Sequence, residues 1–320
     1  MLKVGLVGAG YWGKNLLRVF RALPGVEVCA VADELPDAAR KLAPELPSYR
    51  SAEEMLKAEA VDALLVATPP STHYRVARSA LLAGKHCWVE KPLTLDPAEA
   101  EELVALAYRN RLQLFVDETF LYDPLVQTAR EWIRAGRLGR ILHASFERLG
   151  QGRIRRDSDV WWNSAPHDLS ILCYWFGAAL RRIEVRGFSY LQSGIADVAV
   201  GTVELEDGVS AHIYLSWMAP QKIATATVTG DRGMLLYEGR FGQRKLELYD
   251  FTVADPATVR TNVVPIERFA LSQTLAGGAE EPLALAAEAF VESVRTGIPA
   301  PSAGMYSKRV VEMLAAGQPR

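Results

Sequence analysis

The hydrophobic positions of the first 120 residues form short continuous runs that are separated by amphipathic stretches. Such runs are typical of parallel strands buried on both faces of a sheet, and the stretches between them indicate covering helices. The expected strands are residues 3–7, 26–32, 61–67, 86–89 and 112–116. The expected helices are residues 12–23, 37–42, 72–83 and 96–109, with one more opened by the capping box of Ser51 and Glu54. This alternation predicts a doubly wound α/β domain with a parallel sheet over residues 1–120.

After residue 120 strands follow one another with few helices between them. The expected strands are residues 141–148, 182–191, 196–205, 209–217, 223–229, 234–238 and 246–249. The expected helices are residues 124–135, 165–176, 283–296 and 303–315. Hairpin signals at 206–208 (Glu-Asp-Gly) and 231–233 (Asp-Arg-Gly) predict a mostly antiparallel sheet. Residues 121–320 are therefore expected to form an α+β domain with a large open sheet, and residues 255–279 a surface loop.

Composition and charge narrow the classes of function. A chain of 320 residues is long enough for two domains, and its net charge of −2 argues against nucleic-acid binding, which usually needs a basic excess. The three cysteines show no C-x-x-C spacing, so no metal site is expected. No apolar run approaches the roughly 20 residues that span a bilayer. We therefore expect a cytoplasmic protein without a nucleic-acid or membrane partner.

A glycine-rich turn follows the first expected strand. Gly8, Gly10 and Gly13 fit the G-x-G-x-x-G pattern with Tyr11 and Trp12 between the last two glycines. In a dinucleotide-binding turn the first glycine makes the bend, the second admits the pyrophosphate and the third lets the helix pack on the strand. The motif alone is weak, but here a strand precedes it and a helix follows. These five residues are expected to bind the cofactor.

An acidic residue at the end of the second expected strand supports this interpretation. Asp33 lies 20 residues after the last glycine of the motif, where a carboxylate binds the ribose hydroxyls of the adenosine. A carboxylate there repels a 2′-phosphate, and residues 34–36 supply no arginine to bind one. NAD is therefore favoured over NADP.

A polar segment lies where the third expected strand ends. Thr68, Pro69, Pro70 and His73 belong to the sequence T-P-P-S-T-H. Ligands lie at the carboxyl ends of strands in such sheets, so these residues are expected to contact the cofactor. The alternative is that the prolines only end the strand and a hydroxyl of residues 71–72 caps the next helix.

Glu90 and Lys91, followed by proline, complete a combination of motifs at the end of the fourth expected strand. With the glycine turn, Asp33 and T-P-P-x-x-H, the E-K-P sequence makes the whole chain resemble the Gfo/Idh/MocA family of oxidoreductases. The resemblance implies that Glu90 contributes to the cofactor site and that Lys91 lies near both nicotinamide and substrate. An amine beside the positive nicotinamide ring is disfavoured as ammonium, so it is suited to accept a hydroxyl proton. The alternative is a surface lysine paired with the neighbouring glutamate.

A second set of polar residues lies on a predicted helix in W-W-N-S-A-P-H-D. In the resembled family this position carries an acid, three residues and then a histidine that acts as the catalytic base, and His167 matches it. Asn163 stands in place of the acid, one helical turn away on the same face. Asparagine hydrogen-bonds a hydroxyl but cannot relay a proton. The alternative for His167 is a core histidine capped by a carbonyl group.

The segment around His167 is most similar to family members that act on nucleotide-linked sugars, UDP-N-acetylglucosamine (or its uronic acid) 3-dehydrogenases. Upstream of it, Arg153, Arg155 and Arg156 are candidates to clamp a substrate diphosphate, or else they are solvated surface charges. Tyr122 is a candidate to line the substrate cleft, with packing at the domain junction as its alternative.

We therefore expect an NAD-dependent dehydrogenase that transfers hydride between nicotinamide and a carbon of a sugar, with a nucleotide-linked sugar as the first hypothesis. A dehydrogenase of a free polyol or simple sugar is the second hypothesis. A regulator that binds dinucleotide without turnover is the third, favoured by Asn163 and opposed by Lys91 and His167. Because a large sheet leaves one face to be covered, we expect a homodimer or homotetramer formed through the open sheet of the second domain.

Overall fold

The computed structural model describes residues 1–150, 154–177, 179–240 and 242–319. These residues form two compact units. The first contains residues 1–122 and 281–315, and the second contains residues 123–280 with 316–320. The division at residue 122 lies close to the expected boundary, but the two C-terminal helices belong to the first unit. The sequence had placed them in the second domain.

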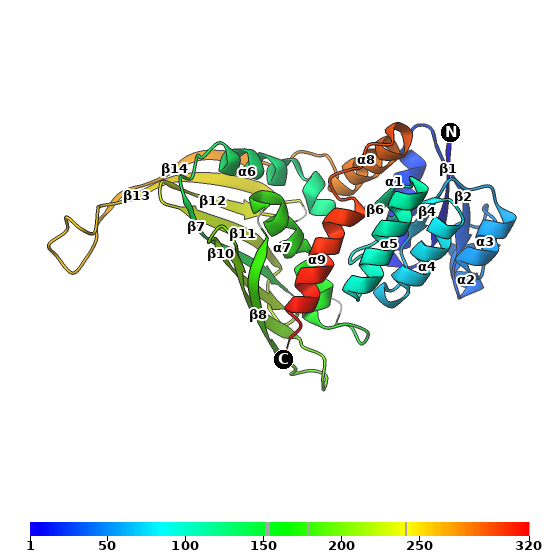
Figure 1. Ribbon diagram of the computed structural model, residues 1–320, viewed down its shortest axis with the longest axis horizontal. Helices are drawn as coiled ribbons and strands as arrows, with labels where there is room; N and C mark the ends of the chain where they lie inside the picture. Colours follow the sequence, from blue (N-terminus) through cyan, green and yellow to red (C-terminus); the bar gives the residue numbers. More distant parts are fainter. Residues whose placement is uncertain (151–153, 178, 241, 320) are drawn as a thin grey trace. The chain divides into compact units, whose positions relative to one another are not determined.

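The first unit is a six-stranded parallel sheet in the order β3-β2-β1-β4-β5-β6, with helices α1 to α5 between the strands (Figure 1). The strands are β1 (Leu2–Val7), β2 (Val26–Ala32), β3 (Ser48–Tyr49), β4 (Ala63–Val66), β5 (His86–Val89) and β6 (Leu114–Val116). The helices are α1 (Tyr11–Ala22), α2 (Pro36–Leu42), α3 (Ala52–Ala58), α4 (Pro70–Leu82) and α5 (Pro97–Asn110), followed by the short 3₁₀ helix η1 (Thr119–Tyr122). The strand order reverses between β1 and β4, where such sheets bind ligands. The prediction of a doubly wound sheet is confirmed. The two-residue strand β3 and the short helix η1 were not predicted from the sequence.

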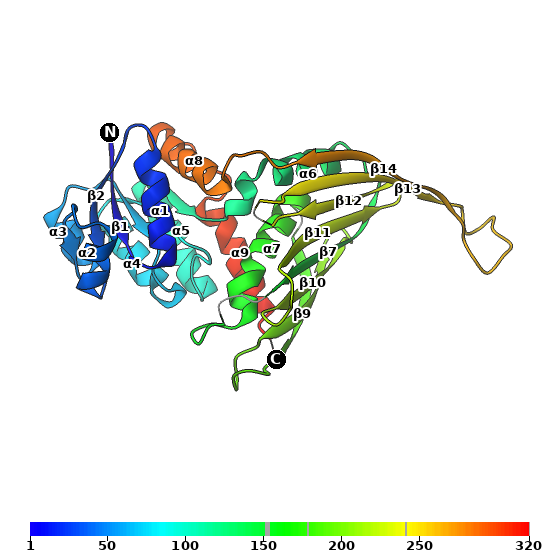
Figure 2. The same ribbon diagram turned by 180° about the vertical axis from the view of Figure 1, so that it is seen from behind.

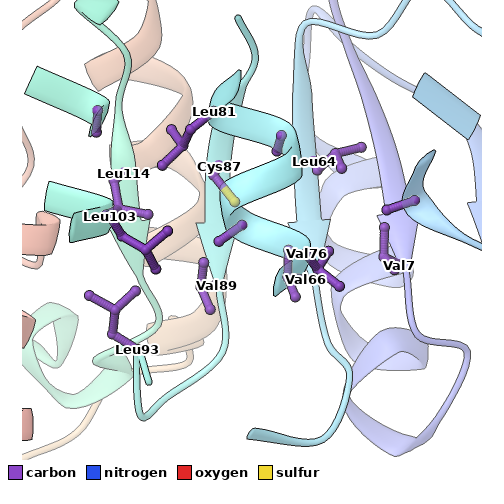
Figure 3. Close-up of a cluster of buried hydrophobic side chains, with 14 of the residues drawn as sticks. Val7, Leu64, Val66, Val76, Leu81, Cys87, Val89, Leu93, Leu103 and Leu114 are labelled. Carbon is purple, nitrogen blue, oxygen red and sulfur yellow. The ribbon is translucent and has the colours of Figure 1, made fainter. Parts of the chain in front are cut away.

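Apolar side chains of the central strands and of α4 and α5 make the core of this sheet. Leu64 and Val66 of β4, Cys87 and Val89 of β5 and Leu114 of β6 carry these side chains to one face, as Figure 3 shows. Each of them is at most 5 % exposed. Full burial of an apolar side chain contributes about 1.5–3 kcal/mol to stability. This packing therefore holds the strands, and the residues at their carboxyl ends, in place.

Two helices from the end of the chain complete the first unit. They are α8 (Pro282–Thr296) and α9 (Gly304–Ala316). Phe290 of α8 makes edge-to-face contacts with Phe20, Trp88 and Phe115, whose ring centroids lie 5.6–6.1 Å from its own. This aromatic cluster joins α8 to α1, β5 and β6.

The second unit is an eight-stranded sheet in the order β14-β13-β12-β11-β7-β10-β9-β8, whose strands β7 and β10 to β14 run side by side in Figure 2. The strands are β7 (Ile141–Leu149), β8 (Leu180–Phe188), β9 (Val198–Leu205), β10 (Ser210–Ser216), β11 (Ile223–Gly230), β12 (Gly233–Glu238), β13 (Lys245–Val253) and β14 (Ile266–Ala276). All neighbouring pairs are antiparallel except β7 and β10, which are parallel. Helices α6 (Pro124–Arg134) and α7 (Val160–Phe176) pack on one face of this sheet (Figure 1). The prediction of a large, mostly antiparallel sheet is confirmed.

Two expectations about this unit are wrong. The stretch 255–279 contains the edge strand β14 rather than only a loop, and nearly all its residues are exposed, so burial leaves no pattern in the sequence. Helix α7 begins at Val160, five residues earlier than expected, because the Asp159 side chain accepts a hydrogen bond from the amide of Trp162 (2.9 Å) and caps the helix.

Among the described residues, no helix is both long and apolar enough to cross a membrane. Within the same residues, no cluster of three or more His, Cys, Asp or Glu side chains is arranged to hold a metal ion.

Candidate cofactor and catalytic site

The glycine turn after β1 has the geometry that the motif requires. Gly8 has a φ of +101°, and a Cβ added to it would lie 2.6 Å from the carbonyl oxygen of Ala67. A Cβ on Gly13 would lie 1.9 Å from the carbonyl oxygen of Gly8. Both positions therefore require glycine, the first for the turn and the second for the close approach of α1 to β1.

The start of α1 is open where a pyrophosphate is expected. A Cβ on Gly10 would meet no atom of the described residues within 4 Å. The helix has no side-chain cap and no acidic residue in its first turn, so its amides and its positive end are available to an anion. Tyr11 and Trp12 are 57 % and 42 % exposed beside this opening. The turn thus fits a dinucleotide.

These two glycines give a matched test of that fit. Gly13→Ala is expected to destabilise the chain by about 1–3 kcal/mol, because its methyl group overlaps the Gly8 carbonyl. Gly10→Ala is expected to leave the free energy of unfolding within about 0.5 kcal/mol of wild type, since nothing surrounds the new methyl group. It should nevertheless weaken NAD binding, because the methyl group stands where the pyrophosphate approaches. Urea unfolding and fluorescence titration with NAD measure the two effects. Wild-type NAD affinity in Gly10→Ala would show that the pyrophosphate lies elsewhere.

Asp33 lies directly after β2 and is fixed by backbone amides. Its Oδ2 accepts a hydrogen bond from the amide of Ala9 (2.8 Å) and its Oδ1 from the amide of Leu35 (2.9 Å). Each carboxylate oxygen has a second acceptor site, which leaves capacity for ribose hydroxyls. The carboxylate is therefore oriented by the glycine turn itself.

An arginine that the local sequence did not reveal lies near this position. Arg75 of α4 has its Nη2 3.8 Å from Oε1 of Glu34 and its Nη1 3.3 Å from Oε1 of Glu53. It lies 42 residues after Asp33 in the chain, so no short-range pattern connects the two. Because the carboxylates of Glu34 and Glu53 already pair with Arg75, this arginine is poorly suited to bind the 2′-phosphate of NADP. Its surroundings therefore agree with NAD as the cofactor.

The segment after β4 lies next to the glycine turn, because β4 is the neighbour of β1 in the sheet. Thr72 Oγ1 lies 2.8 Å from both Thr68 Oγ1 and the carbonyl oxygen of Pro69. Helix α4 begins at Pro70, so Thr72 lies inside the helix and the alternative in which it caps α4 is wrong. The hydroxyl groups instead fix the loop that follows β4.

His73 connects this loop to the one after β5. Its Nδ1 lies 2.8 Å from the carbonyl oxygen of Pro92 and its Nε2 2.9 Å from that of Thr68. The side chain is 1 % exposed, and burial lowers its pKa. A neutral ring donates to one carbonyl at a time. We expected His73 to contact the cofactor; its burial favours a role in holding the Thr68 and Lys91 loops together.

Lys91 lies half-buried after β5, and two acidic side chains lie beside it. Glu90 and Asp117 are 5 % and 1 % exposed, and their carboxyl groups are hydrogen-bonded to each other. Burial raises the pKa of Asp117 to about 6, and burial together with the charge of Asp117 raises the pKa of Glu90 well above its ordinary value. We missed Asp117, although the acidic pair Asp117–Glu118 directly after an expected strand was a usable signal.

In the second unit, Asn163 and His167 lie one turn apart on α7, as the sequence predicted. Both are half-buried, whereas the neighbouring Ala165, Pro166 and Asp168 are buried. The two polar side chains therefore share the less buried side of the helix.

Asp168, the residue after His167 on α7, makes a buried ion pair with Arg148. Its Oδ1 lies 2.7 Å from Nη2 of Arg148 and its Oδ2 accepts a 3.2 Å hydrogen bond from Nε of the same side chain. Asp168 is 2 % exposed and Arg148, on β7, 19 %. This bidentate pair fixes the part of α7 that carries His167 to the sheet.

The remaining substrate candidates have mixed outcomes. Arg153 lies outside the described residues. Arg155 already forms a bidentate pair with Asp157 (2.8 and 2.6 Å), and Arg156 is exposed. Tyr122 is 4 % exposed, and its hydroxyl lies 2.8 Å from Oγ of Ser302 in the same unit, so the structure favours packing within the first unit over lining a cleft.

Both halves of the chain match known family models. Residues 2–118 match the Gfo/Idh/MocA model described as an oxidoreductase family with an NAD-binding Rossmann fold. Residues 126–236 match the Gfo/Idh/MocA C-terminal domain. The fold and the cofactor class expected from the sequence are thereby confirmed.

Three relatives show the range of similar proteins. A UDP-N-acetylglucosamine 3-dehydrogenase of Acidithiobacillus ferrooxidans is 31 % identical over 218 residues, which are 67 % of each chain. An inositol 2-dehydrogenase of Corynebacterium glutamicum is 28 % identical over 227 residues, again 67 % of each chain. A solved structure of a putative oxidoreductase from Magnetospirillum magnetotacticum is 28 % identical, with a TM-score of 0.82 over 99 % of both chains.

Proposed function

Because the chain belongs to the Gfo/Idh/MocA family of NAD-binding oxidoreductases, we propose that it oxidises a CH–OH group of a nucleotide-linked sugar, or reduces the corresponding ketone. The observation that carries this proposal is that four of the expected cofactor and catalytic motifs lie at the carboxyl ends of neighbouring strands. The glycine turn follows β1, Asp33 follows β2, Thr68 follows β4 and Lys91 follows β5. Bound NAD supplies the hydride acceptor for the sugar carbon.

Lys91 is the residue that we assign to the reacting hydroxyl group. It lies half-buried at the end of β5, in the same unit as the glycine turn. As a neutral amine it accepts the hydroxyl proton, and as an ammonium it donates a hydrogen bond that orients and polarises the oxygen. Both roles need the amine to be fixed in place, and the His73 bridge to Pro92 fixes the adjoining backbone.

His167 is the second candidate for the proton transfer. Its place on α7 is held through the neighbouring Asp168, whose ion pair with Arg148 connects the helix to β7. Asn163, one turn earlier, serves as a hydrogen-bonding group for a substrate hydroxyl. Because it carries no charge, it does not support protonation of His167 as an acid would.

The nucleotide-linked substrate is supported by the 31 % identical UDP-N-acetylglucosamine 3-dehydrogenase. The second candidate, a free polyol, is favoured by the inositol dehydrogenase relative and by Arg155, whose guanidinium is already occupied by Asp157. Of the candidates Arg155 and Arg156, Arg156 is better suited to bind a diphosphate, because it is exposed.

The deciding experiment measures nicotinamide reduction with a substrate panel. The purified protein is mixed with NAD and UDP-linked N-acetylhexosamines or their uronic acids, beside free glucose and myo-inositol. We expect NADH absorbance to appear with the nucleotide sugars, and one equivalent per site counts as activity because product release can be slow. Reduction by free polyols alone would replace the proposal with the second candidate. Dinucleotide binding without turnover on any sugar would favour the regulator hypothesis.

A homo-oligomer formed through the open sheet of the second unit is part of the proposal. The sheet face opposite α6 and α7 carries the exposed cross-strand pair of Val200 and Tyr214, 45 % and 40 % exposed. The edge strand β14 adds Phe269 and Leu271, 62 % and 54 % exposed. Apolar groups on a sheet face and an unpaired edge are typical of contacts with a second copy. We place this enzyme in the cytoplasm, in keeping with its three cysteines, none of which is in a disulfide.

A further inference from the structure

Two buried acids lie at the ends of neighbouring strands in the first unit. Glu90 follows β5 and Asp117 follows β6, and the two strands are paired along Cys87–Val89 and Leu114–Val116. The Asp117 amide donates to the carbonyl oxygen of Val89 (2.9 Å), so the backbones of the two acids stay in register. Their carboxyl groups consequently meet in a space closed to solvent.

The hydrogen-bonding of this pair requires a proton. Asp117 Oδ1 accepts a hydrogen bond from the Thr119 hydroxyl (2.8 Å). Glu90 Oε1 and Asp117 Oδ2 receive none from any N–H or O–H donor of the described residues. Two ionised carboxylates in contact repel each other and cannot hydrogen-bond, whereas one proton between them satisfies both oxygens. The burial and contact of the two groups thus fit one shared proton and a single negative charge on the pair.

Lys91 is the basic group whose charge lowers the pKa of both carboxyl groups. It interacts favourably with both Glu90 and Asp117. From α4, His73 also faces Lys91, but its buried ring has a lowered pKa and is neutral. Two further titratable groups near Asp117 are Glu118, next to it in the chain, and Tyr122 of η1. Glu118 is a further carboxyl group beside the pair. The test variants therefore leave Glu118 unchanged.

We propose that Glu90 and Asp117 act as one unit, a proton-sharing acid pair whose single charge positions Lys91 and keeps its amine protonated in the free protein. They are positioning residues, since they act through Lys91. The inference rests on the proposed function only for the role of Lys91. Because the shared proton can reside on either carboxyl group, either group alone is able to supply the charge.

Isosteric amides test this sharing through the reactivity of Lys91. The variants are Glu90→Gln, Asp117→Asn and the double variant, and the readout is trace labelling of lysine amines at one fixed pH, followed by mass spectrometry. Each single variant retains one carboxylate, so Lys91 labelling should stay within about twofold of wild type. The double variant has none, and labelling should rise about tenfold or more, as a neighbouring charge shifts an amine by one unit or more. Exposed Lys41 and Lys57 serve as references in the same sample.

Two results would overturn the proposal. Equal stepwise increases in the two single variants would mean that both carboxyl groups are ionised. No increase in the folded double variant would mean that the pair does not act on Lys91. The double variant leaves no ionisable group at positions 90 and 117, and thermal unfolding checks that it folds.

The labelling needs neither substrate nor cofactor, so it is independent of the proposed dehydrogenase activity. If the substrate panel gives no turnover, the labelling pattern still shows whether Glu90 and Asp117 share a proton. In an active enzyme, the double variant alone should also displace the pH profile of kcat, which a purely structural change would not move.

Discussion

Replacement of Lys91 by methionine is expected to lower kcat by a factor of about 10²–10⁴, the range that a positioned proton-transfer group contributes. Methionine keeps most of the length of the side chain but has neither the charge nor the titratable amine. Lys91 is assigned to the reacting hydroxyl group, whereas the glycine turn and Asp33 are assigned to the pyrophosphate and the ribose, so NAD affinity should fall much less than kcat. Initial rates of NADH formation and a fluorescence titration with NAD measure the two quantities.

A second substitution at this position separates the two roles of the amine. Lys91→Arg keeps the positive charge but cannot release a proton at accessible pH. If Lys91 transfers the proton, Lys91→Arg should be as slow as Lys91→Met. If it only polarises the oxygen, Lys91→Arg should retain much of kcat. Lys57→Met, at an exposed position of the same unit, should leave the rate unchanged. Near-wild-type kcat in Lys91→Met would remove this residue from the mechanism and leave His167 as the base.

The second large effect concerns the ion pair that fixes α7. Arg148→Met should lower the free energy of unfolding by about 3–5 kcal/mol, because it leaves the 2 % exposed carboxylate of Asp168 without its partner. Chemical denaturation at neutral pH measures the loss. Adding Asp168→Asn to this variant should restore part of it, since the uncompensated charge is then gone.

An exposed pair on the same sheet provides the matched control. Arg182 and Glu184 of β8 form an ion pair with side chains 61 % and 62 % exposed. Arg182→Met should cost no more than about 1 kcal/mol, because water screens the charges. Equal losses in Arg148→Met and Arg182→Met would show that burial of Asp168 does not decide the effect.

Local patterns in the sequence determined the first sheet and most of its ligand-binding end. β2 and β5 have the predicted bounds, since a strand buried on both faces needs a continuous apolar run. The glycine turn was readable because Gly8 and Gly13 are required by backbone geometry within six residues. Asp33 and Lys91 were readable because they follow such strands directly.

Tertiary packing decided the features that connect distant segments. β14 is exposed on both faces and joins the sheet only through β13, so its residues show no burial pattern. Phe290 places α8 in the first unit through contacts with three rings that lie far away in the chain. Arg75 reaches Glu34 across 41 residues of the chain, and Asp168 reaches Arg148 across 20.

The candidate site divides in the same way. The sequence by itself determined the NAD-binding fold, the oxidoreductase family, and Lys91 and His167 as the residues to test. Only the tertiary structure decided that His73 and Tyr122 are buried and that Asp117 meets Glu90. The physical reason is that a motif records constraints between near neighbours in the chain. The partners and burial of a side chain depend on which strands the fold brings together.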